Sequence, residues 1–258
     1  MRDTLESVQR ASEIVVVDSF STDRTLEICK EYGCRILQHE YLNSATQKNW
    51  AAPQCAHPWI FQIDSDEIAG PGLWQEMEES IAGADSQTHA FRLPRRNHFL
   101  GEWMQHGGFY PDYQTRLFRR GEGSWQTREV HAHLRVPGKI ATLQDYLIHH
   151  DAPTISRRIC NLDRYTRYEA DELSKKGVRF RWHDVVLRPW AAFGYRYIYL
   201  QGFRDGWRGF VHCVYAAIYV FVSRAKLWEL EELGMERSPR ANDRVRYDHD
   251  NATRASKA

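Results

Sequence analysis

The first third of the chain alternates short apolar runs with helix-like segments, and this alternation restricts the fold more than any other feature. The run EIVVVD ends at Asp18, CRILQH covers residues 34–39, and a third run begins at Trp59. One intervening segment ends at Gly33, and the other covers residues 45–55. Strands that alternate with helices build parallel α/β sheets. The sequence therefore predicts a strand–helix–strand–helix–strand unit.

The third run, WIFQIDSDE, ends in two acids, Asp64 and Asp66. Residues two apart in a strand point to the same side, so both carboxylates should lie together at its carboxyl end. Open α/β sheets bind ligands at that edge, and carboxylates there can hold Mg²⁺ or Mn²⁺ against a diphosphate. Asp18 ends its own strand in the same way and could accept hydrogen bonds from a base or a ribose. The alternative is that these acids only shape turns.

The middle of the chain predicts a helix over residues 71–83 and further strands over residues 89–95, 113–119, 128–136 and 143–150. A loop over residues 97–113 is rich in glycine and aromatic residues. Its rings Trp103, Phe109 and Tyr110 could stack on the apolar face of a sugar, or they could pack in a hydrophobic loop.

From Pro153 the apolar period becomes helical, which predicts a long amphipathic helix and then two helices between Trp190 and Trp228. We expect an α/β domain over residues 1–152, a helical region over residues 153–236 and a disordered tail over residues 237–258. Basic residues flank the apolar faces of the last two helices, as in proteins that rest on an anionic bilayer. A helical hairpin packed on the α/β domain is the alternative.

Composition narrows the class of partner and the compartment. A net charge of +1 argues against a dedicated nucleic-acid binder. Five cysteines without a CxxC pair predict reduced thiols in the cytoplasm. The first residues show no signal peptide, and no apolar run reaches the roughly eighteen residues of a membrane span.

Several motifs together resemble a known family. VVVDSFSTDRT, ATQKNWA, FQIDSDE, HGGFYPDYQTRLFRR, REVH and GFRDGWRGF are similar to motifs of family 2 glycosyltransferases of the GT-A fold. Within that family they look like the branch of lipopolysaccharide core glucosyltransferases. The resemblance covers residues 4–235. It implies an α/β mixed sheet flanked by helices, with a C-terminal helical appendage.

The resemblance also implies an activity, an inverting transfer of a hexose from a nucleotide sugar, UDP-glucose in the first place. The acceptor would be a hydroxyl of a lipid-linked or core oligosaccharide in lipopolysaccharide synthesis. By position, Asp18 would meet the uracil, Lys48 would lie near the nucleotide and Asp64 would touch the ribose. Asp66 would hold the divalent metal, Mg²⁺ or Mn²⁺, which stabilises the departing UDP.

The remaining site residues are expected downstream. The attacking hydroxyl needs a carboxylate base, for which Glu129 and Asp112 are candidates, and Glu129 is preferred because it lies in the REVH segment. Members of the fold often add a late histidine to the metal site and basic residues to the phosphates. The candidates for these two roles are His131, His149, His150, Arg116 and Arg119.

The sequence departs from the family pattern at two places. Family members begin with an apolar strand and an N-E-E-like turn, whereas residues 1–10 contain no such strand, which should leave the sheet interrupted. A glutamate commonly follows the Val-His of this branch, and Ala132 stands there instead. Two alternatives therefore stay open, a truncated chain that binds without turnover and a nucleotidyltransferase. The absence of a glycine-rich phosphate loop disfavours the second.

Overall fold

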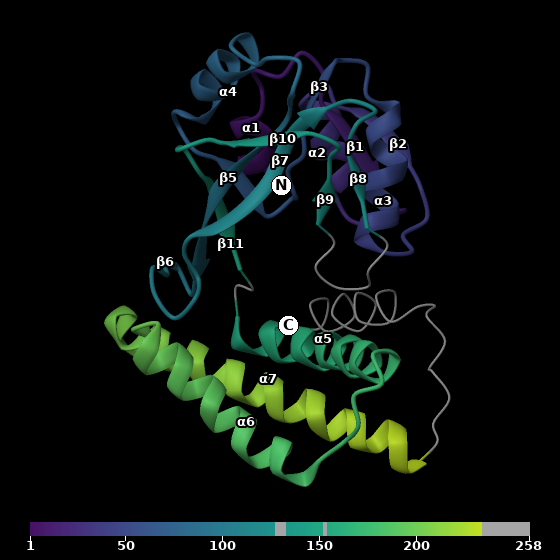
Figure 1. Ribbon diagram of the computed structural model, residues 1–258. Helices are drawn as coiled ribbons and strands as arrows, with labels where there is room; N and C mark the ends of the chain where they lie inside the picture. Colours follow the sequence, from purple (N-terminus) through teal and green to yellow (C-terminus); the bar gives the residue numbers. More distant parts are fainter. Residues whose placement is uncertain (127–132, 152–153, 234–258) are drawn as a thin grey trace.

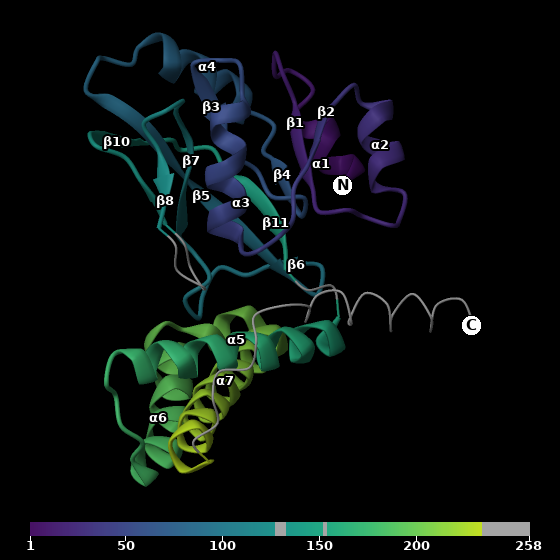
Figure 2. The same ribbon diagram turned by 90° about the vertical axis from the view of Figure 1, so that its right-hand side faces the viewer.

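The computed structural model describes residues 1–126, 133–151 and 154–233. A part built from sheets and their helices is followed by three long helices that lie side by side beneath it (Figure 1). Of these three, α5 lies nearest the sheets, as both Figure 1 and Figure 2 show. The predicted α/β class with a C-terminal helical appendage is confirmed. The predicted tail, residues 237–258, lies outside the described residues.

The smaller sheet agrees with the start of the predicted unit. Strands β1 (Val15–Asp18) and β2 (Arg35–Gln38) pair in parallel, and α2 (Thr25–Glu31) connects them. Gly33 follows α2 with a φ of +68°, a conformation that lets the chain leave a helix without strain when no side chain is present. Asp18 thus stands at the carboxyl end of β1.

The larger sheet is mixed and corrects the prediction for the third strand. Its order is β3, β7, β5, β11, β4, with β10 and β6 also paired to β5. The sequence predicts β3 beside the first two strands in a parallel sheet, but β3 pairs antiparallel with β7. Cross-strand packing explains this pairing, because Ile60 lies opposite Phe118 and Phe61 lies opposite Leu117. Phe118 and Leu117 are both buried. The strands are β3 (Trp59–Phe61), β4 (Glu67–Ala69), β5 (Thr88–Phe99), β6 (Glu102–Trp103), β7 (Asp112–Arg119), β10 (Lys139–Thr142) and β11 (Leu147–His150).

One edge of β1 and one edge of β3 carry no strand partner within the described part of the chain, since β1 pairs with β2 and β3 with β7. This agrees with the expected interruption of the sheet. The start of the chain forms α1 (Arg2–Ser7), which is tied to the larger sheet. Ser7 accepts a hydrogen bond from the Trp74 indole through its carbonyl, at 2.6 Å.

The core of the larger sheet lies under α4 (Leu73–Ala82). Leu73 and Met77 of this helix pack in one buried cluster with Leu93 of β5 and Leu147 of β11. Each such side chain removed from water contributes roughly 1.5–3 kcal/mol. On another side of the sheet, α3 (Ser44–Ala51) and the 3₁₀ turn Ala52–Gln54 cover a second cluster beside the short pair β8 (Ser124–Trp125) and β9 (Leu134–Arg135).

The helical part forms as the period of the sequence predicts. Thr154 caps the first helix by accepting the Arg157 N–H at 3.2 Å. The elements are α5 (Ile155–Lys175), α6 (Trp182–Gly194), a π-helical turn (Tyr195–Tyr199), a 3₁₀ turn (Gly202–Asp205) and α7 (Gly206–Leu233). α7 packs against both α5 and α6.

Candidate active site

The acidic turn after β3 is closed by its own residues. The Asp64 N–H donates to Oε2 of Glu67 at 3.0 Å, and the Glu67 N–H donates to the Asp64 carbonyl at 3.0 Å. Outside the turn, the Thr4 hydroxyl donates to the Ser65 carbonyl, and the His150 N–H donates to the Asp66 carbonyl. Bonds from both ends of the α/β part therefore hold the two acids at one edge of the sheet.

Asp64 is surrounded by cations and amides. Lys48 Nζ lies 3.1 Å from Oδ1, and Arg116 Nη2 lies 2.9 Å from Oδ2. The Gln62 amide also donates to Oδ1 at 2.9 Å. Burial opposes ionisation of this carboxyl, but the charges of Arg116 and Lys48 outweigh burial and hold the pKa of Asp64 below its ordinary range. Asp64 is thus a fixed carboxylate.

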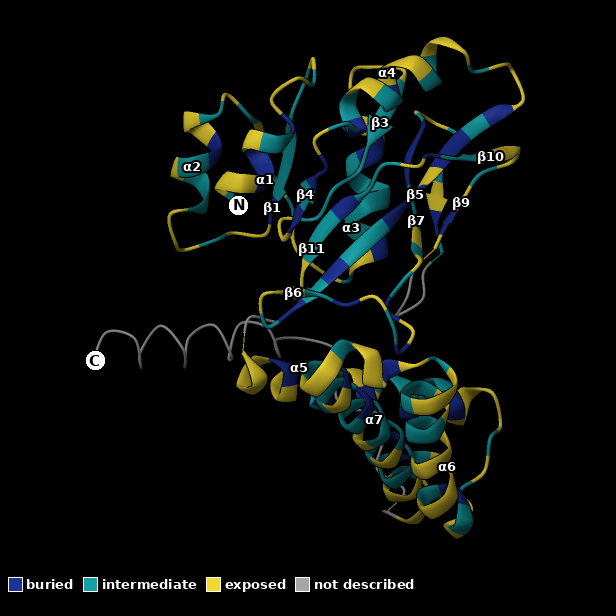
Figure 3. Ribbon diagram, turned by 90° about the vertical axis from the view of Figure 1, so that its left-hand side faces the viewer, coloured by how far each residue is buried: buried dark blue, intermediate teal, exposed yellow. Residues whose placement is uncertain are grey.

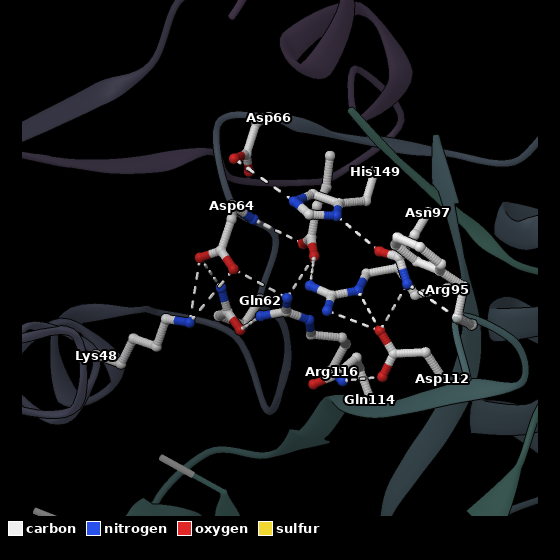
Figure 4. A network of polar contacts seen from close by, with 12 residues as sticks. Lys48, Gln62, Asp64, Asp66, Arg95, Asn97, Asp112, Gln114, Arg116 and His149 are labelled. Carbon is white, nitrogen blue, oxygen red and sulfur yellow. Dashed lines mark hydrogen bonds and ion pairs between the residues drawn. The ribbon is translucent and has the colours of Figure 1, made fainter. Parts of the chain in front are cut away.

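A chain of buried and half-buried charges continues from Asp64 across the sheet (Figure 4). Arg116 also pairs with Glu67 at 2.5 Å, and the Glu67 side chain is fully buried. Arg95 joins Glu67, at 3.1 Å, to Asp112, at 2.7 Å. Burial alone would lower the pKa of Arg116, but Glu67 and Asp64 reverse this and raise it.

Asp66 lies at the open end of the network. Its side chain is 58% exposed, and its Oδ2 lies 3.7 Å from Nε2 of His149. The other ring nitrogen of His149, Nδ1, lies 2.7 Å from Oδ1 of Asn97. An amide oxygen only accepts, so Nδ1 carries a proton, and Nε2 is the ring nitrogen that faces Asp66. Burial raises the pKa of Asp66, but the nearby His149 ring outweighs burial and lowers this pKa.

The charges of the cluster explain why the two acids differ. The cations Lys48, Arg95 and Arg116 are matched by Asp64, Glu67 and Asp112. Within the described residues, the ion pairs of Asp66 consist of the contact with His149 alone. Asp66 is therefore the carboxylate of this turn with free acceptor capacity toward solvent.

The turn after β1 is connected to the same edge through α3. Asp18 is buried, and both its oxygens accept the Ser21 N–H, at 3.2 and 3.1 Å. The Gln47 amide of α3 donates to Ser19 Oγ at 3.1 Å, and the next residue, Lys48, reaches Asp64. The turn after Asp18 on the smaller sheet and Asp64 on the larger sheet are therefore linked through neighbouring residues of α3, Gln47 and Lys48.

Comparison with known proteins decides the family. The family model described as glycosyl transferase family 2 matches residues 1–151, more than half of the chain. This chain belongs to glycosyl transferase family 2. The expected membership and the GT-A fold, a mixed sheet flanked by helices with a helical appendage, are confirmed.

Relatives of this family 2 glycosyltransferase extend over nearly its whole length. The lipopolysaccharide core biosynthesis glycosyltransferase LpsC of Rhizobium meliloti is 28% identical over 236 residues, 89% of this chain and 87% of LpsC. An uncharacterized glycosyltransferase of Rickettsia typhi is 25% identical over 84% of this chain and 78% of its own length. S. aureus TarS in complex with UDP aligns with a TM-score of 0.41 at 16% identity, over 92% of this chain and 88% of that one.

Of the two candidate bases of the glycosyltransferase, only Asp112 lies among the described residues. Asp112 Oδ2 accepts from Arg95 and Asn97, and Oδ1 accepts from Gln114 at 2.6 Å. Burial raises the pKa of Asp112, but Arg95 and these hydrogen bonds outweigh it and lower the pKa. Glu129, His131 and Ala132 lie outside the described residues.

Other predicted contacts lie apart from the cluster. Arg119 donates to the Thr88 carbonyl at 3.0 Å, at the far end of β7 from Asp112. The His150 ring lies beside His98, with centroids 5.5 Å apart. Phe109 is buried against Phe99 and Met104, so the prediction that it could stack on a sugar is wrong for this ring.

Sequence reasoning missed three members of the cluster, Glu67, Arg95 and Asn97. Glu67 directly follows the second acid and reads as one more turn residue, although its side chain is fully buried. Arg95 and Asn97 stand in a run, THAFRLPRRNHF, whose charged residues look solvent-facing. The usable signal was their spacing, because residues two apart in β5 point to one face.

Proposed function

We propose that this family 2 glycosyltransferase moves a hexose, glucose from UDP-glucose in the first place, to a saccharide hydroxyl with inversion at the anomeric carbon. The acceptor class is lipopolysaccharide core oligosaccharide, which the similarity to LpsC, a lipopolysaccharide core biosynthesis glycosyltransferase, supports. Residues 1–152 would carry the chemistry. Residues 153–236 would serve the acceptor side, at the cytoplasmic face of the membrane.

One observation carries the proposal. Of the two acids that end the FQIDSDE run, Asp64 is held by Lys48 and Arg116, while Asp66 is open to solvent and faces His149. A nucleotide-sugar site needs this division of roles. One fixed carboxylate can orient the ribose, and one free carboxylate can bind a cation between protein and diphosphate.

The donor set fits a hard divalent cation that completes its shell with phosphate oxygens. Asp66 offers an oxygen and His149 offers Nε2, with its tautomer set by Asn97. No group of three or more His, Cys, Asp or Glu suited to a metal occurs in residues 1–126, 133–151 and 154–233. Mg²⁺ characteristically binds through one or two protein ligands plus substrate phosphates. When bound, the ion would offset the charge that develops on the departing diphosphate.

The chain's own residues divide the remaining work. Lys48 and Arg116 pair with the carboxylate that would meet the ribose and so hold it in place. Burial lowers the pKa of Lys48, although Asp64 partly offsets this. We assign the base to Glu129 rather than to Asp112, because Asp112 is occupied by Arg95, Asn97 and Gln114. A base needs an oxygen free to take the proton of the attacking hydroxyl.

The test starts with calorimetric titration of UDP with and without Mn²⁺, followed by transfer assays with UDP-glucose and core oligosaccharide. Asp66→Asn should abolish the Mn²⁺ dependence of UDP binding and lower the transfer rate roughly 10²–10³-fold. Glu78→Gln is the control, because Glu78 lies on α4, away from the cluster, and forms an exposed ion pair with Arg10. Full transferase activity in Asp66→Asn would refute the metal assignment.

The same assays separate the alternatives. A nucleotidyltransferase would release pyrophosphate from a nucleoside triphosphate and a sugar phosphate. A chain that binds without turnover would take up UDP but transfer no sugar from any donor. Membership in glycosyl transferase family 2 favours transfer with release of the nucleoside diphosphate.

A further inference from the structure

The outer side of α6 exposes a continuous apolar stripe. Trp182, Trp190 and Tyr199 are 73%, 75% and 73% exposed, values far above those of core aromatics. In Figure 3, exposed segments alternate with intermediate ones along α6. We call this stripe the α6 face. Its four members in α6 follow one another at spacings of four, one and three, which places them on one side of the helix, and its other three members lie in the π-helical turn that follows. Its members are Trp182, Val186, Leu187, Trp190, Tyr195, Ile198 and Tyr199.

Exposed apolar residues continue from the α6 face into the next elements. They lie at intervals along the 3₁₀ turn and α7 and comprise Phe203, Trp207, Phe210, Ile218 and Phe221. A soluble monomer rarely exposes a contiguous apolar surface of this extent, and such a surface marks an interaction site. The two helices that carry it pack against each other, so the surface is a fixed feature of the helical part.

The charge around the α6 face selects the partner. Residues 178–228 contain eight basic and two acidic residues, in a chain whose net charge is +1. Both acids are bonded within the protein, and the basic residues Arg188, Arg208 and Lys226 also pair with carboxylates. Asp184 is buried and bonds Arg188 at 2.6 Å, and Asp205 bonds the His106 N–H at 2.8 Å. Arg181 and Arg204 are exposed at the two ends of the stripe.

We propose that the α6 face binds the surface of a phospholipid bilayer that contains anionic lipids. Tryptophan and tyrosine favour the headgroup level of a membrane because their rings are apolar at one end and polar at the other. Arginines beside them pair with lipid phosphates, and each basic residue near an anionic surface contributes to binding. A second copy of this chain would meet the same excess of positive charge and be repelled.

The helices bind along the bilayer and do not cross it. The helical segment Gly202–Glu232 contains a stretch that is long and apolar enough to span a membrane by length and composition. The side of α7 opposite its exposed residues is bonded to α5, however. The Tyr215 hydroxyl donates to the Arg158 carbonyl at 2.9 Å, and Lys226 Nζ lies 2.7 Å from Asp163 Oδ1. A helix as charged as α5 cannot enter hydrocarbon alongside α7.

The end of the α6 face is hydrogen-bonded to the loop that precedes β7. The Gly107 N–H donates to the Leu200 carbonyl at 2.9 Å, and Arg196 donates to the Gly107 carbonyl at 2.9 Å. Asp205 accepts the N–H groups of both Gln105 and His106. Membrane contact would therefore fix the distance between the membrane surface and the loop that precedes β7. This purpose rests on the proposed lipid-linked acceptor, but the binding itself does not.

The test is co-sedimentation with vesicles of phosphatidylcholine, with and without phosphatidylglycerol, in the absence of donor and acceptor. The wild-type chain should bind the anionic vesicles, less tightly as salt is added. The double variant Trp182→Ser, Trp190→Ser should lose about tenfold or more of its affinity. Leu42→Ser is the matched control, because Leu42 is 67% exposed in the α/β part and should bind as the wild type does.

Three results would overturn the proposal. They are absence of wild-type binding, unchanged binding of the double variant, and a wild-type dimer that the double variant converts to a monomer, which would assign the face to a second copy. An unchanged affinity for UDP establishes that the double variant is folded. Vesicle binding with no sugar transfer would retain this inference while rejecting the proposed function.

Discussion

Glu67 is the buried carboxylate on which two arginines converge, and Glu67→Gln should strongly destabilise the α/β part. Removing one member of a buried ion pair costs about 3–5 kcal/mol, because its partners stay buried without a counter-charge. Arg116 keeps Asp64 and Arg95 keeps Asp112, so the lower end applies. The glutamine also keeps an oxygen that can accept the Asp64 N–H. We therefore expect a loss of about 3 kcal/mol of unfolding free energy.

Urea unfolding followed by tryptophan fluorescence and far-UV circular dichroism measures this change. A loss of 3 kcal/mol corresponds to a fall in melting temperature of roughly 6–12 °C for a chain of this size. Glu78→Gln removes the same charge from an exposed pair and should change the unfolding free energy by at most about 1 kcal/mol. The comparison isolates burial, since the chemical change is identical.

The reasoning fails if Glu67→Gln and Glu78→Gln unfold at the same urea concentration. That result would mean that the arginines find equivalent partners elsewhere and that Glu67 does not organise the acidic turn. A second readout separates stability from site geometry. Because Glu67 also fixes Arg116, which pairs with Asp64, the folded variant should bind UDP more weakly than the wild type does, whereas Glu78→Gln should not.

Three further predictions concern neighbouring contacts. Asn97→Ala removes the acceptor of His149 Nδ1 and should weaken Mn²⁺-dependent UDP binding, measured by calorimetry, about 10–100-fold. Asn97→Asp keeps an acceptor oxygen and should bind UDP more tightly than Asn97→Ala does. Because the pKa of Asp64 is lowered in the folded protein, its stabilising effect is present above its ordinary pKa near 4 and is lost as the pH falls below that value. The unfolding free energies of the wild type and of Asp64→Asn should therefore differ at pH 7 and converge in acid. A difference that does not depend on pH would contradict this. Asp205→Ala should speed hydrogen exchange of the Gln105 and His106 amides, which lose their acceptor, and unchanged exchange would show that the loop is held by other contacts.

The sequence by itself determined the features that depend on local pattern. The β-branched run before Asp18 forms a strand, and Gly33 ends the helix after it. The change to a helical period at Pro153 marks the start of the helical part, and the motif FQIDSDE indicates the family. These features are readable because hydrophobic period, caps and motifs involve residues close in the chain.

Only the tertiary structure decided how these pieces meet. The partner of β3 depends on apolar residues of β7 that lie more than fifty positions away, so no local pattern could choose it over β1. The different surroundings of Asp64 and Asp66 arise because Lys48, Arg116 and His149 come from separate elements. Phe109 is buried because α7 and the loop pack together, with the His212 ring 4.0 Å away between centroids. Long-range pairing and burial set these outcomes, because each depends on which distant surfaces come together when the chain folds.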